Sequence, residues 1–518
     1  MDVIRRIPAG AASEVHDAGR GQEAALPRQR SRLDAERRLH HGGAHLAADR
    51  PDHGRRLAHH ARPALGRGCD STQVRLTLLE ILEATGGGEA GGTQVGNTFS
   101  TFHTDSREVK QGGLFFALRG AEMDGHRFTE DAIARGAAAL VVEQKAELAS
   151  GVVQIVVPST WEALYALAGH VLRRVRPLVV AVTGSNGKTS TKEMVWAILA
   201  KRFNVLRTMG NLNTETGVPL TMLGLEPEHT ALVLEMGMQH AGDIARLAAL
   251  ARPSVGIITN IGSVHMEFFK SQEDLARAKG ELLATLPQDG LAVLNADDRF
   301  FPLLADMTAA RVVSFGFGGG VFRAEGYRTR TGGGSQFSVR GVDVRLMLDG
   351  RHQVRNALAA LAAGEFAGVP IAEGAEALEH VAVEHRMEVL PTKAGFSIID
   401  DAYNASPESM LAAFEALAES PRRGRLLAVL GEMGELGALA EESHRQVGRR
   451  AAEVFDAVCV LDGDSGRILA QSARAELVPD RPAAVAWVRR NAREGDRVLV
   501  KASHGIRLDD VVRQLTAP

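Results

Sequence analysis

The sequence predicts an α/β protein of three domains: a small first α/β domain, a central P-loop-type domain on a parallel sheet, and a C-terminal Rossmann-like, doubly wound domain. The 518 residues suffice for about three domains of ordinary size. Apolar strand-like runs alternate with helix-like runs over most of the chain, which is typical of parallel sheets covered on both faces. A glycine-rich loop at 183–189 follows one of these strands.

Composition excludes several classes of protein. Hydrophobic residues make up 45% of the chain and charged residues 24%, as in globular proteins. The net charge of -3 gives no general basic surface, so we expect no nucleic-acid partner. No apolar run approaches the roughly 20 residues that span a bilayer, and no signal-peptide core is present. We therefore expect a cytoplasmic protein without membrane insertion. Two cysteines, Cys69 and Cys459, are too few for a disulfide framework or a cysteine zinc site.

Residues 1–72 differ from the rest of the chain. They are rich in histidine and arginine, contain no lysine and show no apolar period of 2 or 3.6. Such a segment cannot bury enough surface to offset its ordering entropy. We expect it to be disordered, or to be upstream sequence translated from a start codon placed too early. A histidine-rich metal tail is the alternative.

The remaining chain changes pattern twice, and we expect domains at 73–175, 176–385 and 386–518. In the first domain, a helix is expected at Leu76–Ala84, a strand at Gly113–Ala117 and a helix at Phe128–Arg135. The strands expected in the other two are Leu178–Val182, Ala231–Leu234, Val255–Ile258, Leu291–Leu294, Phe396–Ile399, Leu426–Leu430, Val458–Leu461 and Val498–Val500. The third domain also has two expected helices, Pro407–Ala418 and Glu442–Phe455.

The glycine-rich loop has the features of a phosphate site. Gly184, Ser185, Asn186 and Gly187 follow a strand and precede a helix that starts with Lys188-Thr189. Glycines let backbone N–H groups approach a polyphosphate at the helix N-terminus. The lysine can reach the β and γ phosphates, and the threonine can ligand Mg²⁺. Valine stands at position 182, where the general P-loop has glycine, so the loop is a shorter variant. The alternative is a glycine turn without a ligand.

Two side chains near neighbouring strand ends are candidate metal ligands. Glu235 ends one apolar strand, where a carboxylate can hold Mg²⁺ directly or through water; a solvated strand end is the alternative. His265 lies in the loop after Val255–Ile258. A lone histidine is often structural, and Mg²⁺ prefers oxygen to nitrogen ligands, so spacing alone leaves its role open.

Lys279 lies in the apolar stripe of an expected helix, between Leu275 and Leu282. A buried ammonium is costly unless its head reaches water or its charge changes. Snorkelling is the first interpretation. The second is carbamylation by CO₂, which would convert a cation that repels Mg²⁺ into an anion that holds it.

Together these motifs resemble the Mur ligase family. The resemblance runs from about Val74 to the C-terminus. It rests on the following segments: 183–189, Glu235-Met236-Gly237, Thr259-Asn260-Ile261 with His265, Ala278-Lys279-Gly280-Glu281, Leu294-Asn295-Ala296-Asp297-Asp298, Arg386, and Asp400 to Pro407.

The resemblance implies an ATP-dependent, Mg²⁺-dependent ligase that forms an amide bond. The residues implied in nucleotide binding are Gly184, Ser185, Asn186, Gly187, Lys188, Thr189, Asn260, Asn295, Arg386 and Asp401. Those implied in holding two Mg²⁺ ions are Thr189, Glu235, His265 and carbamylated Lys279. The catalytic residues would be Lys188, Lys279, His265 and Arg386.

Further motifs narrow the implied substrates. Thr104-Asp105-Ser106-Arg107, Gly113 to Gly120 and Asp124-Gly125-His126 resemble the UDP-sugar domain of members that add the third residue or D-alanyl-D-alanine. No Asp-Asn-Pro-Arg motif of third-residue members is present. Asp401 to Pro407 and Leu430 to Gly437 resemble members that add D-alanyl-D-alanine to UDP-N-acetylmuramoyl-tripeptide. Ser106, Arg107, Asp124, Tyr403 and Asn404 would then bind substrate, in an enzyme expected to be a monomer. Gln353 and His504 depart from the family pattern and receive no role.

Three alternatives remain at this point. A folylpolyglutamate synthetase shares the central fold, but its first domain would be the ATPase, whereas about 100 ordered residues are expected before this phosphate loop. A P-loop ATPase that drives transport or binds nucleic acid would hydrolyse ATP without an amine acceptor. It would explain neither Lys279 nor the first domain. The third alternative is an inactive scaffold, against which the complete ligand set argues.

Overall fold

The computed structural model describes residues 75–90, 98–120, 123–147, 152–331, 333–421 and 424–517, without the side chains of 89 and 90. The extension predicted at 1–72 lies outside the described residues. Within the described ranges, no helix combines the length and the apolar character that crossing a membrane requires.

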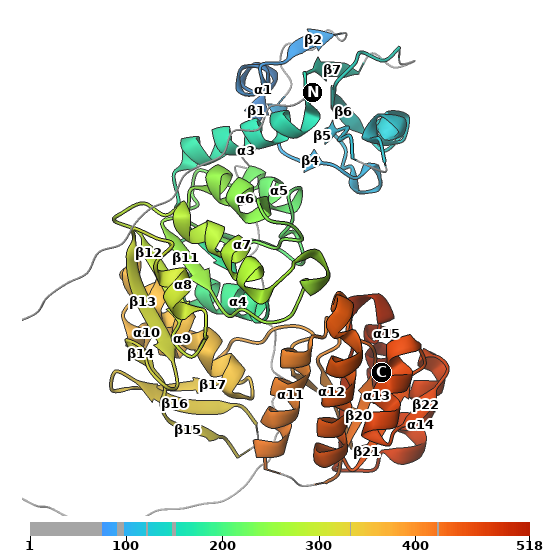
Figure 1. Cartoon of the computed structure of the whole chain (residues 1–518). Coiled ribbons are helices and arrows are strands. Elements are labelled where there is room, and N and C mark those ends of the chain that lie inside the picture. The colour runs from blue at the N-terminus through green and yellow to red at the C-terminus, as the bar shows by residue number, and fades with distance from the viewer. Residues whose placement is uncertain are drawn as a thin grey trace, which may run out of the picture. The chain divides into compact units, whose positions relative to one another are not determined.

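The first domain contains a five-stranded sheet in the order β2-β7-β6-β5-β4, in which only the β2–β7 pair is antiparallel (Figure 1). Its strands are β2 (Gly88–Ala90), β4 (Phe102–His103), β5 (Gly113–Phe116), β6 (Ala137–Val142) and β7 (Val153–Val156). The helices of this part are α1 (Leu78–Thr85), α2 (Thr129–Ala134) and α3 (Thr160–Val175). The strand expected at Gly113–Ala117 and the helix expected at Phe128–Arg135 are both found, slightly shorter than expected.

The helix expected at Leu76–Ala84 begins two residues later than the apolar pattern indicates. Thr77 accepts a hydrogen bond from Glu80 N and forms a capping box with this residue, which sets the start of α1 at Leu78. Leu76 instead pairs with Phe99 in the antiparallel bridge between β1 (Leu76–Thr77) and β3 (Thr98–Phe99). The cap therefore overrides the apolar spacing.

The central domain is built on seven parallel strands in the order β14-β13-β12-β11-β8-β10-β9. These are β8 (Leu178–Thr183), β9 (Val205–Arg207), β10 (Ala231–Glu235), β11 (Val255–Ile258), β12 (Leu291–Asn295), β13 (Arg311–Gly316) and β14 (Phe322–Arg323). The four strands expected from the sequence are confirmed to within one residue. The antiparallel sheet of β15 (Glu325–Thr329), β16 (Ser335–Val339) and β17 (Val342–Leu346) was not anticipated.

Helices cover both faces of the central sheet, as expected for continuous apolar strands. Val180 and Val182 of β8 share one apolar cluster with α4 (Lys188–Leu199) and α9 (Arg351–Phe366). The intervening Val179 and Ala181 belong to the opposite cluster, which includes side chains of α3 and three further helices. These are α5 (Gly217–Leu223), α6 (Asp243–Ala251) and α7 (Gln272–Ala284). The remaining helices of this domain are α8 (Phe301–Ala305) and α10 (Ile371–Leu378).

The third domain is a smaller doubly wound unit, as expected. Its six strands follow the order β18-β19-β23-β20-β21-β22, parallel except for the β18–β19 pair. They are β18 (Glu388–Pro391), β19 (Ser397–Asp400), β20 (Leu426–Leu430), β21 (Ala457–Leu461), β22 (Glu476–Val478) and β23 (Arg497–Lys501). One face packs against α11 (Pro407–Glu419), α12 (Ala440–Val454) and α13 (Asp464–Ala473). The other packs against α14 (Arg481–Asn491) and α15 (Asp509–Thr516).

The glycine-rich loop connects β8 to α4, and at two of its positions neighbouring side chains leave no space for a Cβ atom. Gly184 has a φ of +144°, and a Cβ there would lie 1.9 Å from Thr259 Oγ1, just beyond β11. Gly187 has a φ of +81°, and its Cβ would lie 2.5 Å from Asn356 Oδ1 of α9. Both conformations favour glycine. The loop can therefore lie directly on the end of β11.

Gly184→Ala should displace Thr259, because a real Cβ cannot approach an oxygen so closely. Over-packing of this kind costs about 1–3 kcal/mol, and the loop should also lose its nucleotide-binding conformation. Urea unfolding and calorimetric titration with ADP measure the two effects. Gly319→Ala is the matched control, since its Cβ would meet nothing within 4 Å. An unchanged stability and ADP affinity in Gly184→Ala would contradict this fit.

Candidate functional site

The carboxyl ends of three neighbouring parallel strands bring the expected site residues together. β8 leads into the phosphate loop, β10 ends at Glu235, and β11 is followed by the segment that contains His265. They border a cavity of about 680 Å³. The expected residues that line it are Ser185, Asn186, Gly187, Lys188, Thr189, Glu235, His265, Arg386, Tyr403 and Asn404.

The segment after β11 packs against the phosphate loop and forms hydrogen bonds with its backbone. Asn260 Oδ1 accepts a hydrogen bond from Asn186 N at 3.0 Å, and its Nδ2 donates to Asn186 O at 2.9 Å. Thr259 Oγ1 donates to the same carbonyl at 2.6 Å. Asn295 Nδ2 donates to Thr259 O at 3.1 Å. The Asn260 side chain thus holds the phosphate loop, and the Asn295 side chain holds the segment after β11. The expected contact of both residues with adenine stays a prediction.

Lys188 lies over the loop that it follows. Its Nζ donates to Gly184 O at 2.8 Å and to Ser185 O at 3.2 Å. Burial lowers the pKa of Lys188, against the opposing effect of the Glu235 carboxylate. The ammonium is therefore held by neutral carbonyl oxygens beside a helix N-terminus whose Gly187 cap offers no side-chain acceptor. This arrangement suits an anionic ligand.

Glu235 is a buried carboxylate with one satisfied and one unsatisfied oxygen. Its side chain is 2% exposed, and Oε1 accepts a hydrogen bond from Asn213 Nδ2 at 2.8 Å. Oε2 has no hydrogen-bond partner among the residues that the structure describes. No group of three His, Cys, Asp or Glu residues in the described ranges could hold a metal without further ligands. Mg²⁺ commonly takes one or two carboxylates together with substrate phosphates and waters. Glu235 and Thr189, in one cavity with the phosphate loop, fit that pattern.

Lys279 is buried, so the snorkelling interpretation is wrong. The side chain is only 1% exposed within α7. No hydrogen bond or ion pair of its amine is found among the residues that the structure describes. Burial lowers the pKa of Lys279 well below its usual range, and the positive charge of Lys188 lowers it further. The lowered pKa makes the neutral form of this amine, which is the nucleophilic one, more accessible than that of an exposed lysine.

His265 contacts a carboxylate of the third domain. Its Nδ1 lies 2.5 Å from Glu435 Oε2. Both residues have left-handed backbones, with φ of 68° and 60°. Hydrogen bonding to His265 lowers the pKa of Glu435. Nearby, Ser263 N donates to Glu408 Oε1 at 2.9 Å. Two acidic side chains of the third domain therefore meet the segment after β11.

The third-domain residues expected at the site form their own cluster. The Arg386 guanidinium lies 4.3 Å from the centre of the Tyr403 ring. Asp401 does not line the cavity; its Oδ2 lies 2.6 Å from the buried Nζ of Lys501. Lys501 Nζ also donates to Asn404 O at 3.0 Å. The ion pair thus holds the segment that presents Tyr403 and Asn404 to the cavity.

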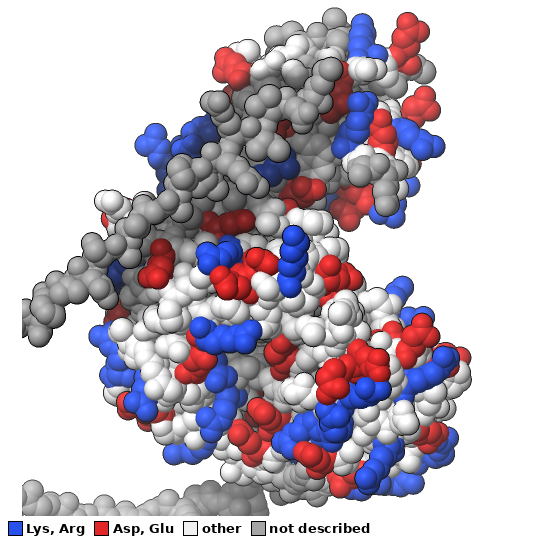
Figure 2. All heavy atoms as spheres, in the orientation of Figure 1, with Lys and Arg blue, Asp and Glu red and all other residues white. Residues whose placement is uncertain are grey.

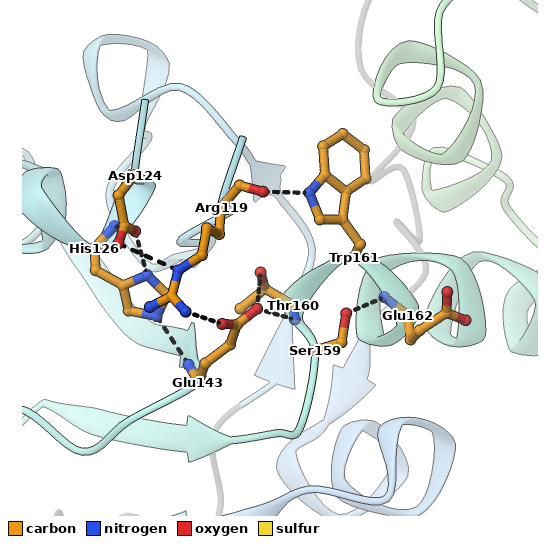
Figure 3. A network of polar contacts seen from close by, with 8 residues as sticks. All are labelled: Arg119, Asp124, His126, Glu143, Ser159, Thr160, Trp161 and Glu162. Carbon is orange, nitrogen blue, oxygen red and sulfur yellow. Dashed lines mark hydrogen bonds and ion pairs between the residues drawn. The ribbon is translucent and has the colours of Figure 1, made fainter. Parts of the chain in front are cut away.

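Asp124 belongs to a hydrogen-bonded network in the first domain (Figure 3). Its Oδ1 lies 2.6 Å from His126 Nδ1, and Glu143 N donates to His126 Nε2 at 2.8 Å, so Nδ1 carries the proton. Arg119 lies 3.3 Å from Asp124 and 3.1 Å from Glu143. Trp161 of α3 donates its Nε1 proton to Arg119 O at 2.9 Å. Asp124 therefore organises this part of the first domain.

The other first-domain candidates are also held locally. The exposed Arg107 side chain pairs with Asp105 at 2.5 Å, and Ser106 is buried at the start of a 3₁₀ turn. Neither residue lines the cavity, nor does Asp124. Their expected substrate contacts stay predictions.

Several residues beside the site had no expected role, and two of them contact expected site residues or share their helix. Glu435 lies in the Leu430 to Gly437 motif and contacts His265. Lys192 follows Lys188 by four residues on α4 and is 1% exposed. The signal for Lys192 was its spacing from Lys188, since residues four apart share a helix face.

Comparison with known proteins agrees with this architecture. Residues 99–181 match the family model "Mur ligase family, catalytic domain", 182–364 the "Mur ligase middle domain", and 385–504 the "Mur ligase, glutamate ligase domain". The chain is 35% identical over 459 residues to the UDP-N-acetylmuramoyl-tripeptide–D-alanyl-D-alanine ligase of Bacillus subtilis, covering 85% of this chain and 98% of that protein.

Two solved structures are similar over most of the chain. MurF from Acinetobacter baumannii has a TM-score of 0.78 at 29% identity, covering 86% of this chain and 99% of that one. MurF ligase from Thermotoga maritima in complex with ADP has a TM-score of 0.71 at 32% identity, covering 80% and 97%. The chain belongs to the Mur ligase family.

Proposed function

We propose that this chain ligates D-alanyl-D-alanine to UDP-N-acetylmuramoyl-tripeptide with ATP, as a cytoplasmic monomer that acts in peptidoglycan precursor synthesis. The similarity to the Bacillus subtilis ligase over nearly its whole length supports these substrates. The observation that carries the proposal is that the phosphate loop, Glu235 and Arg386 line the same cavity. It would let one site hold ATP and join two substrates.

The reaction would have two steps. A substrate carboxylate oxygen attacks the γ-phosphorus of ATP, and ADP leaves with its electron pair. The dipeptide amine then attacks the resulting acyl phosphate, phosphate leaves, and the nitrogen loses a proton. Lys188 would turn from Gly184 O and Ser185 O to the phosphates and neutralise their charge. Arg386 would approach the same phosphates from the third domain.

Glu235 and Thr189 would hold one Mg²⁺ ion, and His265 and modified Lys279 a second. Bound Mg²⁺ would offset the repulsion between the phosphates and the attacking carboxylate. The unsatisfied Oε2 of Glu235 supports the first assignment. The second requires His265 to exchange or share its contact with Glu435.

Lys279 would serve as a carbamate. Its neutral nitrogen attacks the carbon of CO₂ and loses a proton, which leaves an anionic group on the side chain. Three observations support this reaction. The pKa of Lys279 is lowered, its side chain is buried, and its Nζ has no hydrogen bond or ion pair among the described residues. An unmodified ammonium would add a third positive charge beside Lys188 and Mg²⁺.

The outer domains would supply the substrates' remaining contacts. Tyr403 and Asn404, which line the cavity, would bind the dipeptide. Asp401 would bind the nucleotide. Ser106, Arg107 and Asp124 would serve the UDP-sugar. Figure 2 shows acidic and basic side chains interspersed on one face of the molecule, which agrees with small-molecule substrates.

Phosphate release should require ATP, Mg²⁺, the UDP-tripeptide and D-alanyl-D-alanine together. The reason is that phosphate leaves only when the amine attacks the acyl phosphate. A coupled phosphate assay with product mass measures this, and Lys188→Ala should release none. Rapid turnover of ATP with neither peptide substrate present would favour a simple P-loop ATPase instead.

Lys279→Ala should keep the fold and lose most of its activity, because a metal ligand is lost; the loss should be at least the roughly 10- to 100-fold that removing an outer partner of a metal ligand costs. Lys279→Glu should recover part of it by returning an anion at shorter reach. Lys279→Arg should not, since arginine stays cationic. Lys270→Ala, at an exposed position before the same helix, is the control and should be fully active.

Carbon dioxide offers an independent measurement. After dialysis against CO₂-free buffer, added bicarbonate should raise the activity of the unmodified chain and leave that of Lys279→Glu unchanged. A Lys279→Arg enzyme near the original rate would show that the carbamate is not needed.

A further inference from the structure

Lys192 is a fully buried cation behind the phosphate site. It lies one helical turn after Lys188 on α4 and is 1% exposed. Its Nζ donates to Thr208 O at 2.8 Å and lies 3.0 Å from Glu193 Oε1. Lys192 does not line the cavity, whereas Lys188 and Glu235 do. Direct contact with a substrate is therefore not its role.

The carboxylate of Glu235 lies between Lys192 and the cavity. Lys192 Nζ is 4.0 Å from Glu235 Oε2, the oxygen for which the described part of the chain provides no hydrogen bond. Thr208 connects the two residues a second time: its Oγ1 accepts from Glu235 N at 3.0 Å, while its carbonyl accepts from Lys192. Asn213 holds the other oxygen of Glu235. Backbone and carboxylate of Glu235 are thus both fixed.

Two carboxylates lie beside Lys192, and they differ in their other cations. Arg207 Nε lies 2.8 Å from Glu193 Oε2, and the Arg207 guanidinium lies 3.7 Å from the centre of the Trp196 ring, so Glu193 already has a close cation. For Glu235, Lys192 is the cation found within 4.0 Å among the described residues, whereas Lys188 acts on this carboxylate from farther away. A buried carboxylate without a partner is costly.

We propose that Lys192 is a positioning residue: it holds the Glu235 carboxylate in place and balances its charge until Mg²⁺ binds with the nucleotide. The inference rests on the proposed Mg²⁺ site at Glu235. It explains why Nζ stands 4.0 Å from Oε2, close enough to balance charge without taking the oxygen by a hydrogen bond. The competing explanation is structural: Lys192 only ties α4 to the end of β9 through Thr208 O.

The test is ADP binding by calorimetry with Mg²⁺ and with EDTA, which needs neither peptide substrate. Lys192→Met keeps an unbranched side chain that is shorter by one atom, and it removes the ammonium group. It should reduce the gain in ADP affinity due to Mg²⁺ by about tenfold, the usual scale for outer partners of metal ligands, and leave binding in EDTA unchanged. Lys192→Arg should recover part of the gain.

Glu193→Gln is the matched control. It removes the other carboxylate beside Lys192 without touching Glu235, so the gain from Mg²⁺ should persist. Equal weakening of ADP binding with and without Mg²⁺ in Lys192→Met would overturn the proposal. An unchanged gain would overturn it too.

The double variant Lys192→Met/Glu235→Gln distinguishes the two explanations: that Lys192 balances the charge of Glu235, or that it only joins α4 to the end of β9. Adding Lys192→Met to Glu235→Gln should not change the Mg²⁺ effect further, and the double variant should melt at a higher temperature than Lys192→Met. If Lys192→Met does not fold, a folded double variant supports the proposal. If neither folds, the structural tie is correct. Because no ligation is measured, failure here leaves the proposed reaction separately testable.

Discussion

The site depends on the contact between the phosphate loop and the end of β11. Strand register aligns the ends of the three central strands: Glu235 pairs with Val182, and Ile258 with Thr183. The next residue, Thr259, then fills the space that a side chain at position 184 would need. The contact between Thr259 and Gly184 thus brings the loop backbone, the Glu235 carboxylate and the segment with His265 to the same cavity. The outer domains can supply specificity only because this edge is already formed.

Three lysines around this edge have different partners, and the difference suggests three roles. Lys188 bonds loop carbonyl oxygens, which a phosphate can replace. Lys192 is held by Thr208 O and Glu193, behind the carboxylate. Lys279 has neither kind of partner in the described part of the chain, and burial favours its neutral form. In our proposals, these similar residues serve phosphate binding, charge balance and carbamate formation because their surroundings differ.

Local sequence patterns predicted most of the fold and the main members of the site. Apolar runs located β8, β10, β11 and β12, and topology follows because parallel strands end at one edge. The sheet β15–β17 was missed because its strands are partly exposed and therefore do not form the continuous apolar runs by which the other strands were located. The spacing of Lys192 from Lys188 could have drawn attention to this residue, but its contacts with Thr208 and Glu235 join residues distant in sequence, as does the contact of His265 with Glu435, and spacing cannot reveal such contacts. The same holds for the engagement of Asn260 with the loop backbone.

The central claim, that the cavity activates a carboxylate with the γ-phosphate of ATP, has a direct isotopic test. The UDP-tripeptide would carry ¹⁸O in its reacting carboxylate, and the released phosphate would be analysed by mass spectrometry after a single turnover with D-alanyl-D-alanine. An acyl phosphate transfers one labelled oxygen to each phosphate, and the account predicts that result. Unlabelled phosphate, or label found in AMP, would contradict it.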